Sequence, residues 1–353
     1  MARDQTVFSE LTVAMAIAAC SIEKIKNVDE SAINAFERER KKRELISSDN
    51  SEEQLKLAGT KIRNWLFKEK AVRKISVAWT GMEKGKELMQ VARDLVIEDL
   101  GTRISVKEDA QLFQNPSPAR VFNKWPMGDF APSRDGDWFI EVAEDELEAY
   151  FASCGGPKFT KQRTAVDYYK HTKGKTENGE KRRKAFTEHV KSLHDEKSMS
   201  VLSSYQELCR KISNRSAQIF NENIASTLTA ARTSDSIPET LERLFSFFFK
   251  LDNEEHLLCG TDSRKGFAVV VCGLAEWRRQ FQVVSVIAKP IAAGQPEVLL
   301  DFTFRSRASG ESFSYGIKCE VRWSHGKFCG NPESKLYRSG NWSYSNLAWS
   351  KEI

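Results

Sequence analysis

The hydrophobic spacing along the chain is the feature that most constrains its fold. Apolar residues recur at helical spacing through residues 6–48, 52–70 and 137–249. Short apolar runs with strand character fall between and after these segments, in 74–107 and 267–337. This order of helices, a small β element, more helices and a β-rich end predicts a mixed α/β (α+β) architecture.

The length of 353 residues predicts two domains at roughly 150 residues each, with one large or three small domains as alternatives. The changes in pattern divide the chain into three regions. Residues 1–135 would hold N-terminal helices and a β-hairpin, 136–250 a basic helical region, and 251–353 a β-rich region.

Composition limits where such a chain can work. No apolar run approaches the length of a membrane span, and no secretory leader is recognisable at the N-terminus. The seven cysteines form no Cys-x-x-Cys pair, which is typical of reduced thiols. We therefore expect a cytoplasmic protein without a membrane segment.

The most informative stretch is a predicted hairpin, with strands at 93–98 and 103–107 around the turn 99–102. Side chains alternate along a strand, so Ser105 and Lys107 share one face. Asp94, at the start of the first strand, would lie near Lys107 on that face. A carboxylate and an ammonium group placed in this way can act together with a divalent cation and a water molecule. The alternative is an exposed hairpin with solvated charges.

This stretch resembles the PD-(D/E)xK nuclease superfamily, in particular type II restriction endonucleases. The similarity covers roughly residues 75–122 and is carried by Ile-Ser-Val-Lys-Glu-Asp-Ala at 104–110, Asn-Pro-Ser-Pro at 115–118 and Val-Phe at 121–122. It implies a central β-sheet core flanked by helices. It also implies that Asp94 binds Mg²⁺ and that Lys107 is the catalytic lysine.

The chain departs from the pattern of this family at two positions. Ser105 stands where the family has its second acid, and Arg93 replaces the proline. A carboxylate from elsewhere would then complete the metal site. The candidates are Glu108 and Asp109, just after the lysine, and Glu10 on the first helix, where relatives often carry an acid.

Two further regions carry residue types that contact DNA. Around 320–335, arginine, histidine, asparagine and lysine lie close together, and arginine and asparagine are the side chains that pair with guanine and adenine. The basic segment 158–197 is suited to phosphate contacts, although a solvated helix face is the alternative for such a segment. The candidate DNA-binding residues are Lys181, Arg182, Arg183, Arg322, His325, Lys327, Asn331 and Lys335. A weaker metal motif pairs Asp301 with Glu320.

The resemblance implies a site-specific deoxyribonuclease of a restriction-modification system that uses Mg²⁺ to hydrolyse phosphodiester bonds of double-stranded DNA. Such enzymes usually act as homodimers and are paired with a separate DNA methyltransferase. Three alternatives remain: a DNA- or RNA-binding protein without catalysis, a nuclease of the same core in phage defence or repair, and a protein-interaction scaffold.

Overall fold

The structure is a computed structural model. It describes residues 2–46, 49–81, 94–107, 112–114, 116–127, 137–172, 177–231, 237–249, 251–262 and 265–353. Over this part of the chain the fold is a mixed α/β architecture with a six-stranded and a five-stranded sheet, so the predicted class is confirmed.

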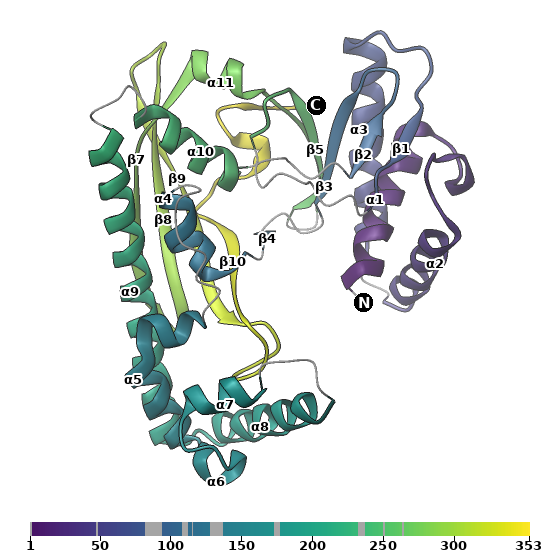
Figure 1. Cartoon of the computed structure of the whole chain (residues 1–353). Helices are drawn as coiled ribbons and strands as arrows, with labels where there is room; N and C mark the ends of the chain where they lie inside the picture. Colours follow the sequence, from purple (N-terminus) through teal and green to yellow (C-terminus); the bar gives the residue numbers. More distant parts are fainter. Residues whose placement is uncertain are drawn as a thin grey trace.

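Three helices come first in the chain, and the first and third of them pack on the first sheet (Figure 1). They are α1 (Ala2–Ala18), α2 (Glu30–Glu44) and α3 (Ser51–Glu69), with a 3-10 turn η1 (Ile22–Lys24) between the first two. The Asp29 carboxylate caps α2 by accepting a 2.7 Å hydrogen bond from the backbone N–H of Ala32. Gly59 lets α3 approach α1 closely, because a Cβ atom there would lie 2.7 Å from that of Ala16. These helices therefore hold α1 firmly against the sheet.

The first sheet combines strands from distant parts of the chain. Its strands are β1 (Val77–Trp79), β2 (Leu95–Ile97), β3 (Thr102–Lys107), β5 (His256–Asp262), β6 (Lys265–Val271) and β11 (Ser350–Glu352), in this spatial order. All neighbours are antiparallel except β3 and β5, which run parallel. One face, with Ile104, Val106 and Cys259, packs in the core that α1 and α3 share. Leu258 and Val269, on the opposite face, belong to the second core.

The second sheet is antiparallel throughout. Its strands, in spatial order, are β4 (Leu112–Gln114), β10 (Pro332–Ser339), β9 (Ser312–Trp323), β8 (Gln295–Ser306) and β7 (Phe281–Ala293). Buried and half-exposed residues alternate along β8 and β9, which is the pattern of a sheet covered on one face. Figure 1 shows α9 (Met199–Ala231) running along this sheet, and α5 (Trp138–Ser153) packs on α9.

The remaining helices surround this second unit. They are the π-helical turn η2 (Arg120–Lys124), α4 (Trp125–Met127), α6 (Gly156–Thr160), α7 (Ala165–Thr172), α8 (Glu177–Asp195), α10 (Ile237–Phe249), α11 (Leu274–Gln280) and the 3-10 turn η4 (Tyr344–Asn346). In Figure 1, α6, α7 and α8 lie together beyond one end of α5. The basic segment of the sequence thus forms a projecting helical group.

The predicted regions 1–135, 136–250 and 251–353 do not coincide with the two sheets. The C-terminal region supplies β5, β6 and β11 to the first sheet and β7–β10 to the second. The N-terminal region likewise supplies β4 to the second sheet. Each sheet is therefore built from both ends of the chain.

Candidate active site and nucleic-acid interface

The predicted hairpin is confirmed. Strands β2 and β3 pair with Leu95 opposite Ile104, and the Asp94 N–H donates to the Ile104 carbonyl at 3.0 Å. Gly101 adopts φ 62° in the connecting turn, a conformation that glycine takes without steric cost. This register sets Asp94 beside Ser105 at the end of the hairpin remote from the turn.

Asp94 is the centre of a compact polar cluster. Its Oδ2 atom accepts hydrogen bonds from the Ser105 hydroxyl at 3.1 Å and from the Val106 N–H at 2.7 Å. The Lys107 ammonium lies 3.8 Å from the same oxygen. Asp94 is 8% exposed and Ser105 is 1% exposed, so β3 fixes the carboxylate away from bulk water. The three side chains that the sequence assigns to this place are therefore brought together.

Glu10 reaches the same region from α1. It is 5% exposed, and its Oε2 accepts a 2.6 Å hydrogen bond from the Trp79 indole N–H on β1. Burial and the negative charge of Asp94 raise the pKa of Glu10 to about 8, while the Trp79 hydrogen bond and the charge of Lys107 act in the opposite direction. Two carboxylates and one ammonium group therefore form one electrostatic unit.

Asp94 and Glu10 are the two acids that the structure describes in this cluster. Within the described residues, every side-chain contact of Asp94 reaches Oδ2 and the hydrogen bond to Glu10 reaches Oε2. Oδ1 of Asp94 and Oε1 of Glu10 have no side-chain partner among the residues that the structure describes. Mg²⁺ is commonly held by one or two carboxylates together with water and substrate phosphates. The described part of the chain contains no group of three or more His, Cys, Asp and Glu residues suited to a metal. Glu108 and Asp109 lie outside the described residues.

Strand β5 supports the hairpin from the other side of β3. Gly260 pairs with Lys107 and has a φ of 142°. A Cβ atom at this position would lie 1.7 Å from the Lys107 carbonyl oxygen. The neighbouring thiol of Cys259 is fully buried, and its burial raises its pKa, so this cysteine is an inert packing residue. The lysine is thus positioned by a contact that only glycine permits.

The candidate base-reading residues separate into two groups. Arg322 is occupied by ion pairs with Glu333 at 3.1 Å and Glu320 at 3.7 Å. Lys327 lies with its ammonium 4.6 Å from the centre of the Tyr205 ring, and burial lowers its pKa. These two side chains serve local structure, while Lys335 lies half-exposed on β10.

His325 and Asn331 line a large cavity instead. The cavity has a volume of about 970 Å³, and α8 contributes Arg183 and Lys184 to its wall. The β9–β10 loop is anchored by Phe328, which is 1% exposed and stacks on Tyr150 with ring centres 5.2 Å apart. The structure therefore brings three of the predicted DNA contacts, Arg183, His325 and Asn331, to one preorganised place.

The basic residues of α8 differ in exposure. Lys181, Arg182 and Lys184 are exposed, whereas Arg183 is half-buried and donates to the backbone carbonyl of Thr172 at the end of α7. This contact ties the two helices together. The exposed members of the group remain suited to a polyanion.

The two acids of the weaker metal motif, Asp301 and Glu320, do not lie together. Asp301 pairs across the sheet with Gly316, four residues from Glu320, which corresponds to about 13 Å along the strand. Asp301 also accepts an ion pair from Lys289 at 2.7 Å. Asp301 and Glu320 therefore do not form a shared carboxylate site.

Trp79 is the residue of the site that sequence reasoning missed. It lies 69 positions from Glu10 in the chain, and no local motif connects the two. A tryptophan in a short apolar strand is typical of a core residue. Trp79 is also part of the core, with 7% of its surface exposed.

Comparison with protein-family models, curated proteins and solved structures finds no match to this chain. Among the described helices, none has the length and apolar character that crossing a bilayer requires.

Proposed function

We propose that the protein is a Mg²⁺-dependent, site-specific deoxyribonuclease of the type II restriction class that hydrolyses phosphodiester bonds of double-stranded DNA. The observation that carries this proposal is the Lys107 ammonium 3.8 Å from the Asp94 carboxylate, with the buried Glu10 close enough for the charges of both to act on its pKa. Two carboxylates and a lysine are the set that the resemblance to PD-(D/E)xK nucleases implies. Glu10 then takes the place of the acid that is missing at Ser105.

Each residue has a distinct role in this proposal. Asp94 and Glu10 would hold Mg²⁺ through their oxygens, and Mg²⁺ bound there would neutralise phosphate charge and lower the pKa of a water molecule. Lys107 orients the attacking water and stabilises the charge that develops on the phosphate. Ser105 and the Val106 N–H fix the orientation of the Asp94 carboxylate.

The projecting helices and the β9–β10 loop supply the DNA contacts. Exposed Lys181, Arg182 and Lys184 on α8 bind phosphates, which positions the duplex without reading its sequence. His325 and Asn331 lie in the adjoining cavity, where Asn331 can read an adenine edge. A homodimer acting on a palindromic site in the cytoplasm, with a separate methyltransferase protecting the host, completes the proposal.

The test is cleavage of phage genomic DNA with and without Mg²⁺ by the intact protein and by the variants Asp94→Ala, Lys107→Ala and Glu10→Ala. We expect discrete fragments that require Mg²⁺ and disappear with each variant. Asp301→Ala is the matched control, because it removes an acid from a motif that does not converge. It should leave the fragments unchanged.

Other results would point to other functions. Cleavage that survives Asp94→Ala and Lys107→Ala would place the active centre elsewhere. DNA binding without cleavage of any substrate would favour a non-catalytic DNA-binding protein, for which Ser105 in place of an acid is the supporting observation. Cleavage restricted to modified DNA would assign the nuclease to phage defence.

A further inference from the structure

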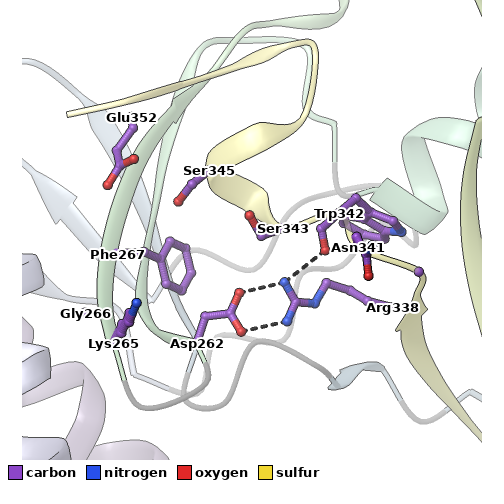
Figure 2. A pocket seen from close by; sticks show the side chains of 11 residues that line it. Asp262, Lys265, Gly266, Phe267, Arg338, Asn341, Trp342, Ser343, Ser345 and Glu352 are labelled. Atoms are coloured by element: carbon purple, nitrogen blue, oxygen red, sulfur yellow. Dashed lines mark hydrogen bonds and ion pairs between the residues drawn. The ribbon is translucent and has the colours of Figure 1, made fainter. Parts of the chain in front are cut away.

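A second cavity, of about 420 Å³, lies where the two sheets meet (Figure 2). Its wall is formed by the ends of β5 and β6 on one side and by the end of β10 with the following loop on the other. The lining includes Asp262, Phe267, Arg338, Asn341, Ser343 and Ser345. None of them belongs to the hairpin or to the α8 cavity.

This cavity lies on the same face of the first sheet as Lys107. Lys107 pairs with Gly260, and Gly260 pairs with Phe267 on the next strand. Residues paired across a sheet point to the same face, and two strand spacings amount to about 10 Å. Gly260 has no side chain to separate Lys107 from Phe267. At about 3.4 Å per base step, the cavity is two to three nucleotides from the candidate active site.

The polar wall of the cavity is preorganised. Both terminal nitrogens of Arg338 contact the Asp262 carboxylate at 2.6 Å, and one also donates to the Trp342 carbonyl at 3.2 Å. The Trp342 indole donates to the Gly316 carbonyl at 2.9 Å, which holds the loop after β10 in place. Among the described residues, the buried Nε of Arg338 has no hydrogen-bond partner. The Arg338 guanidinium is thus fixed in the cavity wall by its terminal nitrogens, while its Nε atom is covered by protein.

The charges of the cavity cancel. Asp262 and Glu352 carry two negative charges, and Lys265 and Arg338 carry two positive charges. A phosphate site would instead have an excess of cations. The lining combines an aromatic ring, Phe267, with the amide of Asn341 and two hydroxyls, which is the lining that suits a neutral, planar group with several donors and acceptors.

The concave shape decides how a nucleobase could enter. Bases within a duplex are read by side chains that reach into a groove, whereas a base that has left the double helix is held in a pocket of the protein. We propose that the Arg338 cavity receives a single nucleobase extruded from the DNA, two to three nucleotides from the cleaved phosphate, with Asn341 and Ser343 contacting its edge. This inference rests on the proposed nuclease function.

The experiment places the fluorescent base 2-aminopurine at each position within four base pairs of the cleavage point, in duplexes bound by the Lys107→Ala protein. If no cleavage is seen, the duplexes come from binding selection on a randomised library. Fluorescence rises when this base leaves the stack, so we expect a several-fold rise at one position. Ser345→Phe, which fills the cavity, and Asn341→Ala should each abolish the rise or reduce it strongly.

Asn214→Ala is the control, because Asn214 is an exposed asparagine on α9. It should leave the rise unchanged. A mismatch opposite the responding base removes the cost of unpairing and should strengthen binding by about tenfold. The absence of a rise at every position, or a rise that persists in Ser345→Phe, would overturn the cavity assignment while Mg²⁺-dependent cleavage stands. A rise without cleavage by the intact protein would retain the cavity and reject the nuclease.

Discussion

The indole nitrogen of Trp79 donates a 2.6 Å hydrogen bond to Oε2 of Glu10, across 69 residues of sequence. The bond joins the first strand of the sheet to the helix that covers it. It is the one hydrogen bond recorded for the Glu10 side chain in the described part of the chain. The orientation of this acid therefore depends on an indole that neither titrates nor binds a metal.

Replacing this donor should destabilise the protein most at high pH. Trp79→Phe leaves a buried carboxylate without its partner, at a cost of about 1–3 kcal/mol when Glu10 is ionised. The free energy of unfolding, measured with urea at pH 6 and pH 9, should fall more at pH 9. Trp349→Phe is the control, because the Trp349 indole nitrogen is buried without a hydrogen-bond partner among the described residues. The free energy of unfolding that Trp349→Phe loses should be the same at both pH values.

Glu10 itself should make stability depend on pH. Its pKa in the folded protein is raised to about 8 from 4.5, so the folded state holds a proton that the unfolded state has already released between these values. Stability contributed by this group is complete below pH 4.5 and is lost as the pH rises toward 8. Glu10→Gln should remove this loss. The variant should gain stability relative to the intact protein as the pH rises from 5 to 9, by an amount on the order of 4 kcal/mol without Mg²⁺. A constant difference between the two proteins across this range would contradict the raised pKa.

Placing an acid at position 105, where the nucleases that the hairpin resembles carry one, should create a dependence on Mg²⁺. Ser105 is 1% exposed and 3.1 Å from Asp94, so Ser105→Asp places a third carboxylate in the cluster. We expect the free energy of unfolding of this variant, measured in EDTA, to fall by about 3 kcal/mol, because like charges repel when they are shielded from water. Mg²⁺ should restore most of it. Ser105→Asn has the same shape without the charge, and its melting temperature should not respond to Mg²⁺.

The contact between Gly260 and Lys107 predicts a sharp difference between two glycines. Gly260→Ala places a Cβ atom 1.7 Å from the Lys107 carbonyl oxygen. The substitution should lower the free energy of unfolding by more than about 3 kcal/mol or displace the end of β3. Gly294→Ala has a positive φ of 58° with no atom within 4 Å, and should cost only about 1 kcal/mol. Equal losses in thermal unfolding would show that the sheet accommodates the extra atom.

The basic group on α8 should set the salt dependence of DNA binding. Each phosphate contact contributes a slope close to one in a plot of log affinity against log salt. Arg182→Gln should therefore lower the slope by about one and weaken binding to all sequences alike. Lys68→Gln, which removes an 83% exposed cation on α3, is the matched control. An unchanged slope in Arg182→Gln would exclude α8 from the interface.

The hairpin could be predicted because its determinants are local. Alternating apolar residues and Gly101 lie within a few positions of one another, and together they fix which face carries Asp94 and Lys107. The same holds for the third helix, predicted at 52–70 and found at Ser51–Glu69, while the spacing over 6–48 does not divide the first two helices from each other.

The assembly of the site is not local, and the sequence alone does not predict it. Lys107 and His256, the residues that bound the gap between β3 and β5, are 149 positions apart, and nothing in either strand specifies its partner. Resemblance, and no spacing rule, placed Glu10 among the candidate acids. The partner of Glu10, the glycine behind Lys107 and the Arg338 cavity depend on packing between elements that are distant in sequence.

The parallel pairing of β3 with β5 also dictates when the site can exist. A ribosome that has added 250 residues has released the hairpin and α1, but β3 still lacks the neighbour that holds the Lys107 backbone. Contacts between such distant segments form late and slowly. Shortened or unfinished chains would therefore carry every side chain of the cluster without the alignment that unites them. Under the proposed nuclease function, the order of synthesis would act as a safeguard for the genome of the cell.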